Sequence, residues 1–363
     1  MKVSVVISAR NEFPNIVHTI HSIVNDLETF LRHDDFEIIL VDNGSTDPLS
    51  WRYLMERGMF YYRTVRVLFD PLMGNVTARN KGAAIAKGDY LFFSDAHMSY
   101  KVGSFKAMIK AIDERGGIVH PLVQWMGGYE PSQPSYQYTI KLGEKIWGTW
   151  NNYLPVLGKS FWIPVSGHCC LGMKRQQFVD FGGYNDWFRC YGGGELYLDL
   201  KWWMLGAGVS VVPDAVGYHL SAGRGYSFVQ NDLIHNMMLL AFAMQAPAFA
   251  ERVYLRYLGK EGVNKAVLTK LYNEARAESF SEESFWQTHE HVSFYDMITA
   301  RPWDSRNMVE HGKSNSAVTV FDSTWTRELS GDALALFNAS PLQKELGERI
   351  AGQWAHLVYK GSA

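Results

Sequence analysis

The sequence predicts an α/β protein with a Rossmann-like, mostly parallel sheet flanked by helices, and a helical C-terminal extension. Short apolar runs alternate with stretches of helical periodicity up to about residue 228. Several of these runs end abruptly in polar residues, as strands do at the ligand-binding edge of an open α/β sheet. Beyond that point the periodicity is helical, so we expect one domain at 1–228 and a mainly helical region at 229–363 that binds an acceptor or packs against the first.

The composition is that of a globular protein with a substantial core. Hydrophobic residues make up 47% of the 363 residues and charged residues 20%, which excludes an intrinsically disordered chain. The formal net charge of −2 provides no overall attraction to nucleic acid or anionic membranes. The aromatic content of 14% is compatible with a surface that stacks sugars or bases.

The cysteines and apolar segments indicate a cellular location. Cys169 and Cys170 are adjacent and Cys190 stands alone, so no disulfide framework is indicated. The N-terminal apolar run is too short for a signal peptide, and Met237–Met244 is too short for a membrane span. We therefore expect a soluble cytoplasmic protein, in the host cytoplasm if a virus encodes it.

The first elements form a β–α–β unit. Strands are expected at Val3–Ser8 and Phe36–Val41, with an amphipathic helix over Ile16–Leu31 between them. Asp42 follows the second strand, where its carboxylate could accept hydrogen bonds from a base or ribose. Alternatively, residues 43–47 only form a turn and cap the next helix, and both interpretations can hold together.

A third strand at Val65–Phe69 and a helix over Gly74–Lys87 follow. Arg79 and Lys81 in this helix could meet a phosphate group, although such residues also form ordinary solvated faces. The next strand is expected at Tyr90–Phe93.

Asp95 and His97 stand just beyond this strand, two residues apart. In extended backbone, side chains at such positions lie on the same side, so both could aim at one point. A carboxylate and an imidazole that converge suggest a divalent metal. The alternative is a strand end that carries two solvated polar residues.

Further along, a helix is expected at Phe105–Glu114 and a strand at Gly117–Val123. Residues 124–159 are rich in Trp, Tyr and Gly with weak periodicity, which predicts an irregular insertion that shapes an acceptor pocket. His168 lies in an apolar stretch and is expected to make a structural or substrate contact, not to bind metal.

Three consecutive glycines precede Glu195, which opens a predicted helix. A carboxylate in the first helical turn is favoured by the helix dipole, so capping is one interpretation of Glu195. The glycine run exceeds what a cap needs and would let a substrate approach the backbone at Gly193 and Gly194. Asp199 is one turn further on and is expected to share a face with Glu195.

The last strand of the sheet is expected at Val209–Pro213, followed by His219. Arg224 lies between glycines in a loop that could close over a pyrophosphate. The helical stretch at 251–276 carries six basic residues, which glutamates partly offset.

Six stretches together resemble the motifs of family 2-type glycosyltransferases of the GT-A fold, and within them most closely the catalytic domain of polypeptide N-acetylgalactosaminyltransferases. In order along this chain they are Val3–Glu12, Ile38–Asp47, Ala78–Ala84, Ser94–His97, Gly192–Glu195 and Val216–His219.

The resemblance implies a role for each matched residue. Asp95, His97 and His219 would hold a divalent cation, Mn²⁺ or Mg²⁺, that bridges the diphosphate of a UDP-sugar. Asp42 would bind the uracil or ribose, and Arg79 would contact the nucleotide.

Glu195 would lie beside the donor sugar or the acceptor hydroxyl, with Asp199 as a later acidic residue. A carboxylate there can take the acceptor's proton or stabilise an oxocarbenium-like transition state. The chain departs from the family pattern because Leu196 follows Glu195 and Leu198 stands where the pattern carries Glu. The donor sugar and the stereochemistry stay open, although the resemblance suggests retention.

The sequence thus predicts a metal-dependent glycosyltransferase that uses a UDP-sugar. Its acceptor is either a saccharide, lipid-linked glycan or protein, or a hydroxymethylated pyrimidine in DNA, as for virus-encoded enzymes. An inert sugar-nucleotide-binding protein is an alternative from another class. A nucleotidyltransferase is disfavoured because Ala9–Glu12, after the first strand, is not a glycine-rich phosphate loop.

Overall fold

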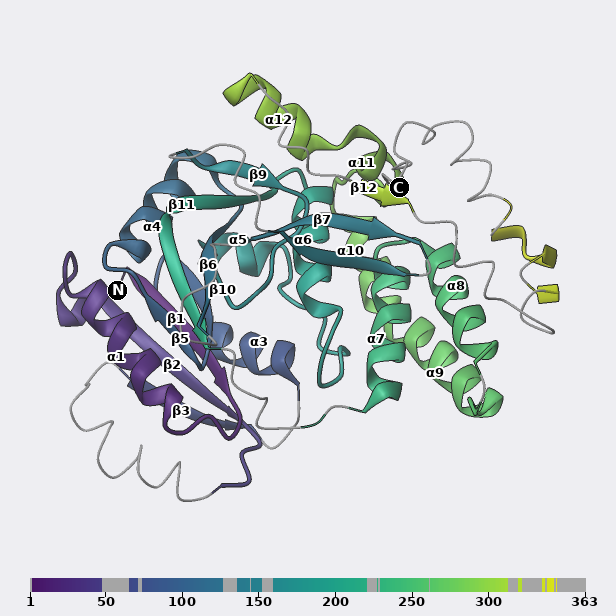
Figure 1. The fold of residues 1–363 in the computed structure, drawn as a ribbon, viewed down its shortest axis with the longest axis horizontal. Coiled ribbons are helices and arrows are strands. Elements are labelled where there is room, and N and C mark those ends of the chain that lie inside the picture. The colour runs from purple at the N-terminus through teal and green to yellow at the C-terminus, as the bar shows by residue number, and fades with distance from the viewer. Residues whose placement is uncertain are drawn as a thin grey trace.

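The structure is a computed structural model that describes residues 2–47, 65–70, 74–126, 136–143, 145–151, 159–220, 227, 229–260, 262–312, 319–321, 335, 336, 338–342 and 344. Within these residues, the centre of the fold is a nine-stranded sheet (Figure 1). Its strands are β1 (Val3–Ala9), β2 (Phe36–Asn43), β3 (Val65–Asp70), β4 (Tyr90–Asp95), β5 (Met98–Tyr100), β6 (Ile118–Met126), β9 (Phe161–Ile163), β10 (Cys170–Lys174) and β11 (Val209–Leu220).

The sheet has the order β3-β2-β1-β4-β10-β6-β11-β5, and β9 pairs with β11. Strands β1 to β4 are mutually parallel, β6 is parallel to β11, and β10 is antiparallel to its neighbours β4 and β6. The parallel strands place their carboxyl ends on one edge, which is where open α/β sheets bind ligands.

Helices cover both faces of the sheet. Along β1, Val5 and Ile7 pack into a cluster with α1 (Asn15–Leu27) and α4 (Ser104–Arg115). Val6 points the other way, because neighbouring side chains on a strand alternate, and joins a second cluster on the opposite face. The helices of that face are α3 (Asn75–Ile85), α5 (Arg175–Asp180) and α6 (Gly194–Met204). The predicted α/β class, a mostly parallel sheet flanked by helices, is confirmed.

The C-terminal region is helical, as predicted. Its helices are α7 (Gln230–Ala243), α8 (Pro247–Leu258), α9 (Lys265–Glu278), α10 (Phe280–Thr288), α11 (Phe294–Ala300) and α12 (Pro302–His311). Figure 1 shows α7, α8 and α9 side by side at the end of the molecule away from α1. Their buried residues belong to the same hydrophobic cluster as those of α6, and the domain boundary near residue 229 stays a prediction. No described helix combines the length and apolar character that a membrane span requires.

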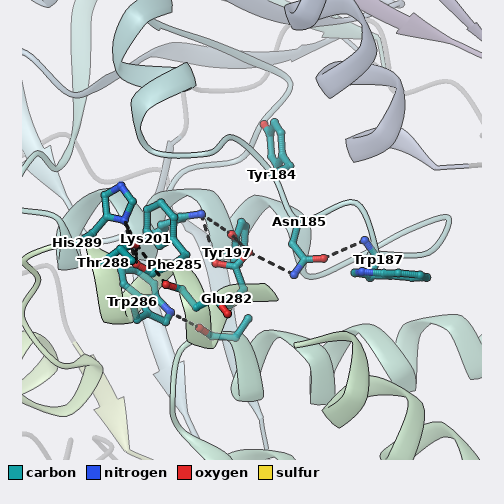
Figure 2. A network of polar contacts seen from close by, with 12 residues as sticks. Tyr184, Asn185, Trp187, Tyr197, Lys201, Glu282, Phe285, Trp286, Thr288 and His289 are labelled. Atoms are coloured by element: carbon teal, nitrogen blue, oxygen red, sulfur yellow. Dashed lines mark hydrogen bonds and ion pairs between the residues drawn. The ribbon is translucent and has the colours of Figure 1, made fainter. Parts of the chain in front are cut away.

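A buried polar contact fixes α10 to α6 (Figure 2). The ammonium of Lys201 on α6 donates to Glu282 Oε2 at 3.3 Å and to the Tyr197 hydroxyl at 2.7 Å. That hydroxyl in turn donates to Glu282 Oε1 at 2.6 Å, and the Phe285 ring centroid lies 3.9 Å from the ammonium. The C-terminal region is therefore fastened to the helix that begins at Gly194.

The prediction of irregular structure at 124–159 is wrong for part of this stretch. The structure has a hairpin there, formed by β7 (Tyr136–Leu142) and β8 (Ile146–Asn151). The strand β12 (Thr319–Phe321), far along the chain, pairs with β7 in parallel. Because this partner is so distant in sequence, no local pattern reveals the small sheet.

Candidate active site

A pocket of about 390 Å³ lies at the carboxyl ends of β1, β2 and β4. Ser8, Asn43 and Asp95 mark the ends of these three strands on its wall. His219 near the end of β11 and Glu195 in the first turn of α6 also line the pocket. The structure thus brings together groups that are widely separated in sequence.

The predicted extended geometry of Asp95 and His97 is wrong. Strand β4 ends at Asp95, and Ala96 and His97 form a turn that leads into β5. Strand β5 then pairs antiparallel with β11, where the Leu220 N–H donates to the His97 carbonyl at 3.1 Å. This pairing, and not alternation along one strand, places His97 beside His219.

Asp95, His97 and His219 each offer one ligand atom, and these atoms lie within 4.8 Å of one another. Nε2 of His219 is 3.5 Å from Oδ2 of Asp95, and the two imidazole centroids are 4.7 Å apart. Nδ1 of His219 is buried and has no hydrogen-bond partner in the described part of the chain. A carboxylate oxygen with two imidazoles suits a divalent cation such as Mn²⁺. The residues fit a metal, and their role as ligands stays a prediction.

Arg79 lies behind Asp95 and does not line the 390 Å³ pocket. Its guanidinium is 1% exposed and donates to Asp95 Oδ1 at 3.1 Å and to the His168 carbonyl at 2.6 Å. Burial would raise the pKa of Asp95, but the His219 hydrogen bond and the Arg79 charge hold that pKa below its usual range. In this position Arg79 keeps Asp95 ionised. Because its guanidinium is buried behind Asp95, it is not placed to make the contact with a nucleotide in this pocket that the sequence had predicted.

Glu195 is positioned by the turn that opens α6. Gly192 and Gly193 have φ values of +91° and +87°, a left-handed conformation that favours glycine. Burial raises the pKa of Glu195, because the charged form loses hydration, and the Asp95 carboxylate adds repulsion. A carboxyl group of raised pKa on a pocket wall is suited to exchanging a proton.

Close packing explains why glycine is needed at positions 193 and 194. A Cβ atom on Gly194 would lie 2.3 Å from Cγ1 of Val76 on α3, and one on Gly193 would lie 2.8 Å from Cε1 of Phe188. Neither glycine lines the 390 Å³ pocket, so the predicted approach of a substrate to them is not needed to account for the glycine run.

The predicted catalytic position of Asp199 is corrected by the structure. Asp199 is fully buried, accepts the Ser166 N–H and hydroxyl at 2.5 and 3.0 Å, and lies 3.0 Å from His168 Nε2. It does not reach the pocket, because its side of α6 faces the chain at 166–168. His168 makes a structural contact, one of the two alternatives expected of it, and the residue is also among those that line the pocket.

Of two other predicted binding residues, one lies outside the pocket and one outside the described residues. Asp42 is buried and its Oδ1 accepts the Ser45 N–H at 2.8 Å, as in the turn-forming interpretation, while the neighbouring Asn43 lines the pocket. Arg224 lies outside the described residues, so its closing over a pyrophosphate stays a prediction.

Sequence reasoning did not name Glu12, Trp125 or Trp150 individually as residues of the pocket wall. Oε2 of Glu12 lies 3.1 Å from Nδ1 of His97, and its place in the polar loop after the first strand was an available signal. Trp125 packs its ring 4.4 Å from that of His219, and Trp150 on β8 lies 5.4 Å from Trp125. The aromatic-rich stretch 124–159 was expected to shape a pocket, but nothing singled out Trp150 within it, because the hairpin that carries it was not predicted.

Comparison with known proteins agrees with this geometry. Residues 4–180 match the family described as Glycosyl transferase family 2. Polypeptide N-acetylgalactosaminyltransferase 10 of Homo sapiens is 26% identical over 298 residues, which is 76% of this chain and 48% of that protein. Polypeptide N-acetylgalactosaminyltransferase 3 of Drosophila melanogaster is 28% identical over 254 residues, covering 62% and 36%. The chain spans about half the length, or less, of the curated relatives it matches.

Among solved structures, the crystal structure of GalNAc-T7 with UDP, GalNAc and Mn²⁺ aligns with a TM-score of 0.64. The sequence identity is 19%, and the alignment covers 86% of this chain and 58% of the other. This likeness confirms the predicted fold. Residues 4–180 therefore match a glycosyl transferase family 2 domain, and the chain has a GT-A-like fold.

Proposed function

We propose that this protein is a metal-dependent glycosyltransferase that transfers a sugar from a UDP-sugar to an acceptor hydroxyl. The observation that carries the proposal is the convergence of Asp95, His97 and His219 within 4.8 Å, on the same pocket as Glu195. The names of the relatives, polypeptide N-acetylgalactosaminyltransferases, support transfer of a sugar, and the Mn²⁺ and UDP in the GalNAc-T7 structure support the choice of metal and nucleotide.

The chemistry follows from the side chains on the pocket wall. A bound divalent cation would neutralise charge on the diphosphate as the sugar–phosphate bond breaks. Asp95, His97 and His219 would hold that cation. Glu195 would take the proton of the acceptor hydroxyl or stabilise an oxocarbenium-like transition state. Retention of the anomeric configuration is the proposed outcome, on the basis of the resemblance to the N-acetylgalactosaminyltransferases.

Trp125 and Trp150 form an aromatic wall of the pocket, and we propose that the acceptor contacts this wall. Indole rings pack well against flat apolar faces, which both a sugar ring and a pyrimidine offer. The experiment must therefore distinguish two kinds of acceptor. One is a saccharide, glycan or protein, and the other is a hydroxymethylated pyrimidine in DNA. A cytoplasmic location is supported by three buried cysteines that form no disulfide.

The decisive experiment measures hydrolysis of a panel of UDP-sugars without acceptor, with and without Mn²⁺. We expect hydrolysis that requires Mn²⁺ and is lost in Asp95→Ala. If metal and UDP bind but no donor is turned over, the protein is an inert sugar-nucleotide-binding protein.

The acceptor is then identified by mass. The enzyme is incubated with the active donor and, in parallel, with hydroxymethylated DNA, oligosaccharides and peptides. If the nucleoside masses are unchanged after digestion of the DNA, DNA is excluded as the acceptor. Proton NMR of the product determines the anomeric configuration.

A further inference from the structure

A buried row of polar side chains leads from Asp199 on α6 to Asp95 at the pocket. Nε2 of His168 lies 3.0 Å from Oδ1 of Asp199, and Nδ1 of His168 lies 2.9 Å from the Tyr184 hydroxyl. Nη1 of Arg79 donates to the same hydroxyl at 3.2 Å, and Nη2 of Arg79 donates to Asp95 at 3.1 Å. The first four members are buried, and we call the five residues the Asp199–Asp95 row.

With a neutral imidazole at His168, one arrangement of protons satisfies every contact in the row. A guanidinium has no acceptor atom, so Arg79 must donate to the oxygen of Tyr184. Burial raises the pKa of Tyr184, so its hydroxyl keeps its proton and donates it to Nδ1 of His168. His168 then carries its own proton on Nε2 and donates it to Asp199. The hydrogen bonds therefore run in one direction, from Arg79 to the carboxylate of Asp199.

The row fixes Arg79 in a single place. A fully buried charge that loses a partner is costly, so the guanidinium cannot leave its acceptors without a large penalty. Its acceptors are Asp95 Oδ1, the His168 carbonyl and the Tyr184 hydroxyl. With Oδ1 of Asp95 held by Arg79, the second oxygen, Oδ2, is directed toward His219 at 3.5 Å.

We propose that Tyr184 and His168 are positioning residues that set the affinity of the Asp95–His97–His219 triad for a divalent metal, by fixing the Arg79 guanidinium against Asp95. Groups behind the ligands of a metal site orient those ligands, and removing one weakens metal binding by about 10–100-fold. The inference rests on the metal site of the proposed function.

The principal variant is Tyr184→Phe, which removes only the hydroxyl shared by Arg79 and His168. Free Mn²⁺ is measured by electron paramagnetic resonance during titration of the full chain without nucleotide. We expect the Kd for Mn²⁺ to rise about 10–100-fold. We also expect the Mn²⁺ concentration for half-maximal UDP-sugar hydrolysis to rise in proportion, while kcat at saturating Mn²⁺ is largely restored.

Tyr197→Phe is the matched control. It also removes a buried tyrosine hydroxyl with two polar partners, Lys201 and Glu282, but these lie outside the row. The two variants should lose similar thermal stability, and Tyr197→Phe should keep the wild-type Kd for Mn²⁺.

A second pair of variants tests the row at His168. His168→Gln keeps an acceptor for the Tyr184 hydroxyl, whereas His168→Leu does not. We expect His168→Gln to retain more of the Mn²⁺ affinity than His168→Leu at comparable stability.

The outcomes separate this inference from the proposed function. If the wild-type chain binds no Mn²⁺, the metal site itself is wrong and the inference is lost with it. If the wild type binds Mn²⁺ and Tyr184→Phe binds it as tightly as Tyr197→Phe does, the positioning role is overturned while the metal site stands.

Discussion

The ammonium nitrogen of Lys201 lies 3.3 Å from Oε2 of Glu282, and both side chains are almost completely buried. We expect Glu282→Ala to lower the free energy of unfolding by about 3–5 kcal/mol, because it leaves a buried ammonium without its counter-charge. Urea unfolding followed by circular dichroism measures the loss.

The matched control removes both charges at once. The double variant Lys201→Met/Glu282→Met should recover part of the lost stability, since an apolar pair of similar volume needs no counter-charge. The recovery is partial because the Tyr197 hydroxyl and the Asn185 amide lose their acceptor. The exposed pair Lys110 and Glu114, 3.7 Å apart, provides a second comparison, and Glu114→Ala should cost less than about 1 kcal/mol. If Glu282→Ala and Glu114→Ala lowered the free energy of unfolding equally, the buried pair would be no more important for stability than the exposed one.

Gly194 tests whether the glycine run serves packing or ligand approach. Gly194→Ala should reduce both stability and activity, because the new Cβ would lie 2.3 Å from Cγ1 of Val76 and push α6 away from α3. Adding Val76→Ala removes the clashing methyl and should restore much of the activity. If the double variant stays as inactive as Gly194→Ala, the glycine is required by a ligand instead. UDP-sugar hydrolysis and thermal unfolding measure the two effects.

Glu195→Gln should lower kcat by about 10²–10⁴-fold while leaving the Kd for Mn²⁺ near the wild-type value. A base must be ionised, and burial raises the pKa of Glu195, so activity of the wild type should rise with pH through a range above that of an ordinary glutamate. This acidic limb should be absent from the pH profile of the variant. A profile with the same limb in both proteins assigns the ionisation to another group.

His120 should make the fold sensitive to acid. Burial lowers its pKa from 6.5 to about 4, so below pH 6.5 the unfolded chain binds a proton that the folded chain refuses. Stability is therefore lost as pH falls, by roughly 3 kcal/mol between pH 6.5 and 4, at 1.36 kcal/mol per unit of pKa difference. The loss should be smaller in His120→Gln, as measured by urea unfolding across that range. Parallel pH dependence in the two proteins contradicts the assignment.

The elements that the sequence predicted well are those whose evidence is local. The apolar runs at β1, β2 and β4, and the periodicity of α1 and α4, are visible within a few residues of chain. Asp95 and His97 were found from their spacing, although the geometry assumed for them was wrong, because β4 ends at Asp95 and the next two residues form a turn.

What could not be predicted depends on contacts between distant segments. The antiparallel pairing of β5 with β11 sets His219 against His97, and no local pattern encodes that register. The orientation of α6 was equally hidden: helical spacing places Asp199 near Glu195, but only packing against 166–168 determines that one is buried and the other borders the pocket. Trp150 was not singled out within the aromatic-rich stretch 124–159 for the same reason, since its hairpin is completed by β12.

The parallel pairing of β12 with β7 also affects how the protein responds to proteolytic cleavage. Strand β7 is central in the small sheet only while Thr319–Phe321 stays in place. Cleavage upstream of that strand, followed by its release, would turn β7 into an open edge, with a row of backbone N–H and C=O groups that can pair with another molecule. A nicked preparation would therefore lose solubility through edge-to-edge association, and it would do so on the hairpin that delivers Trp150 to the pocket.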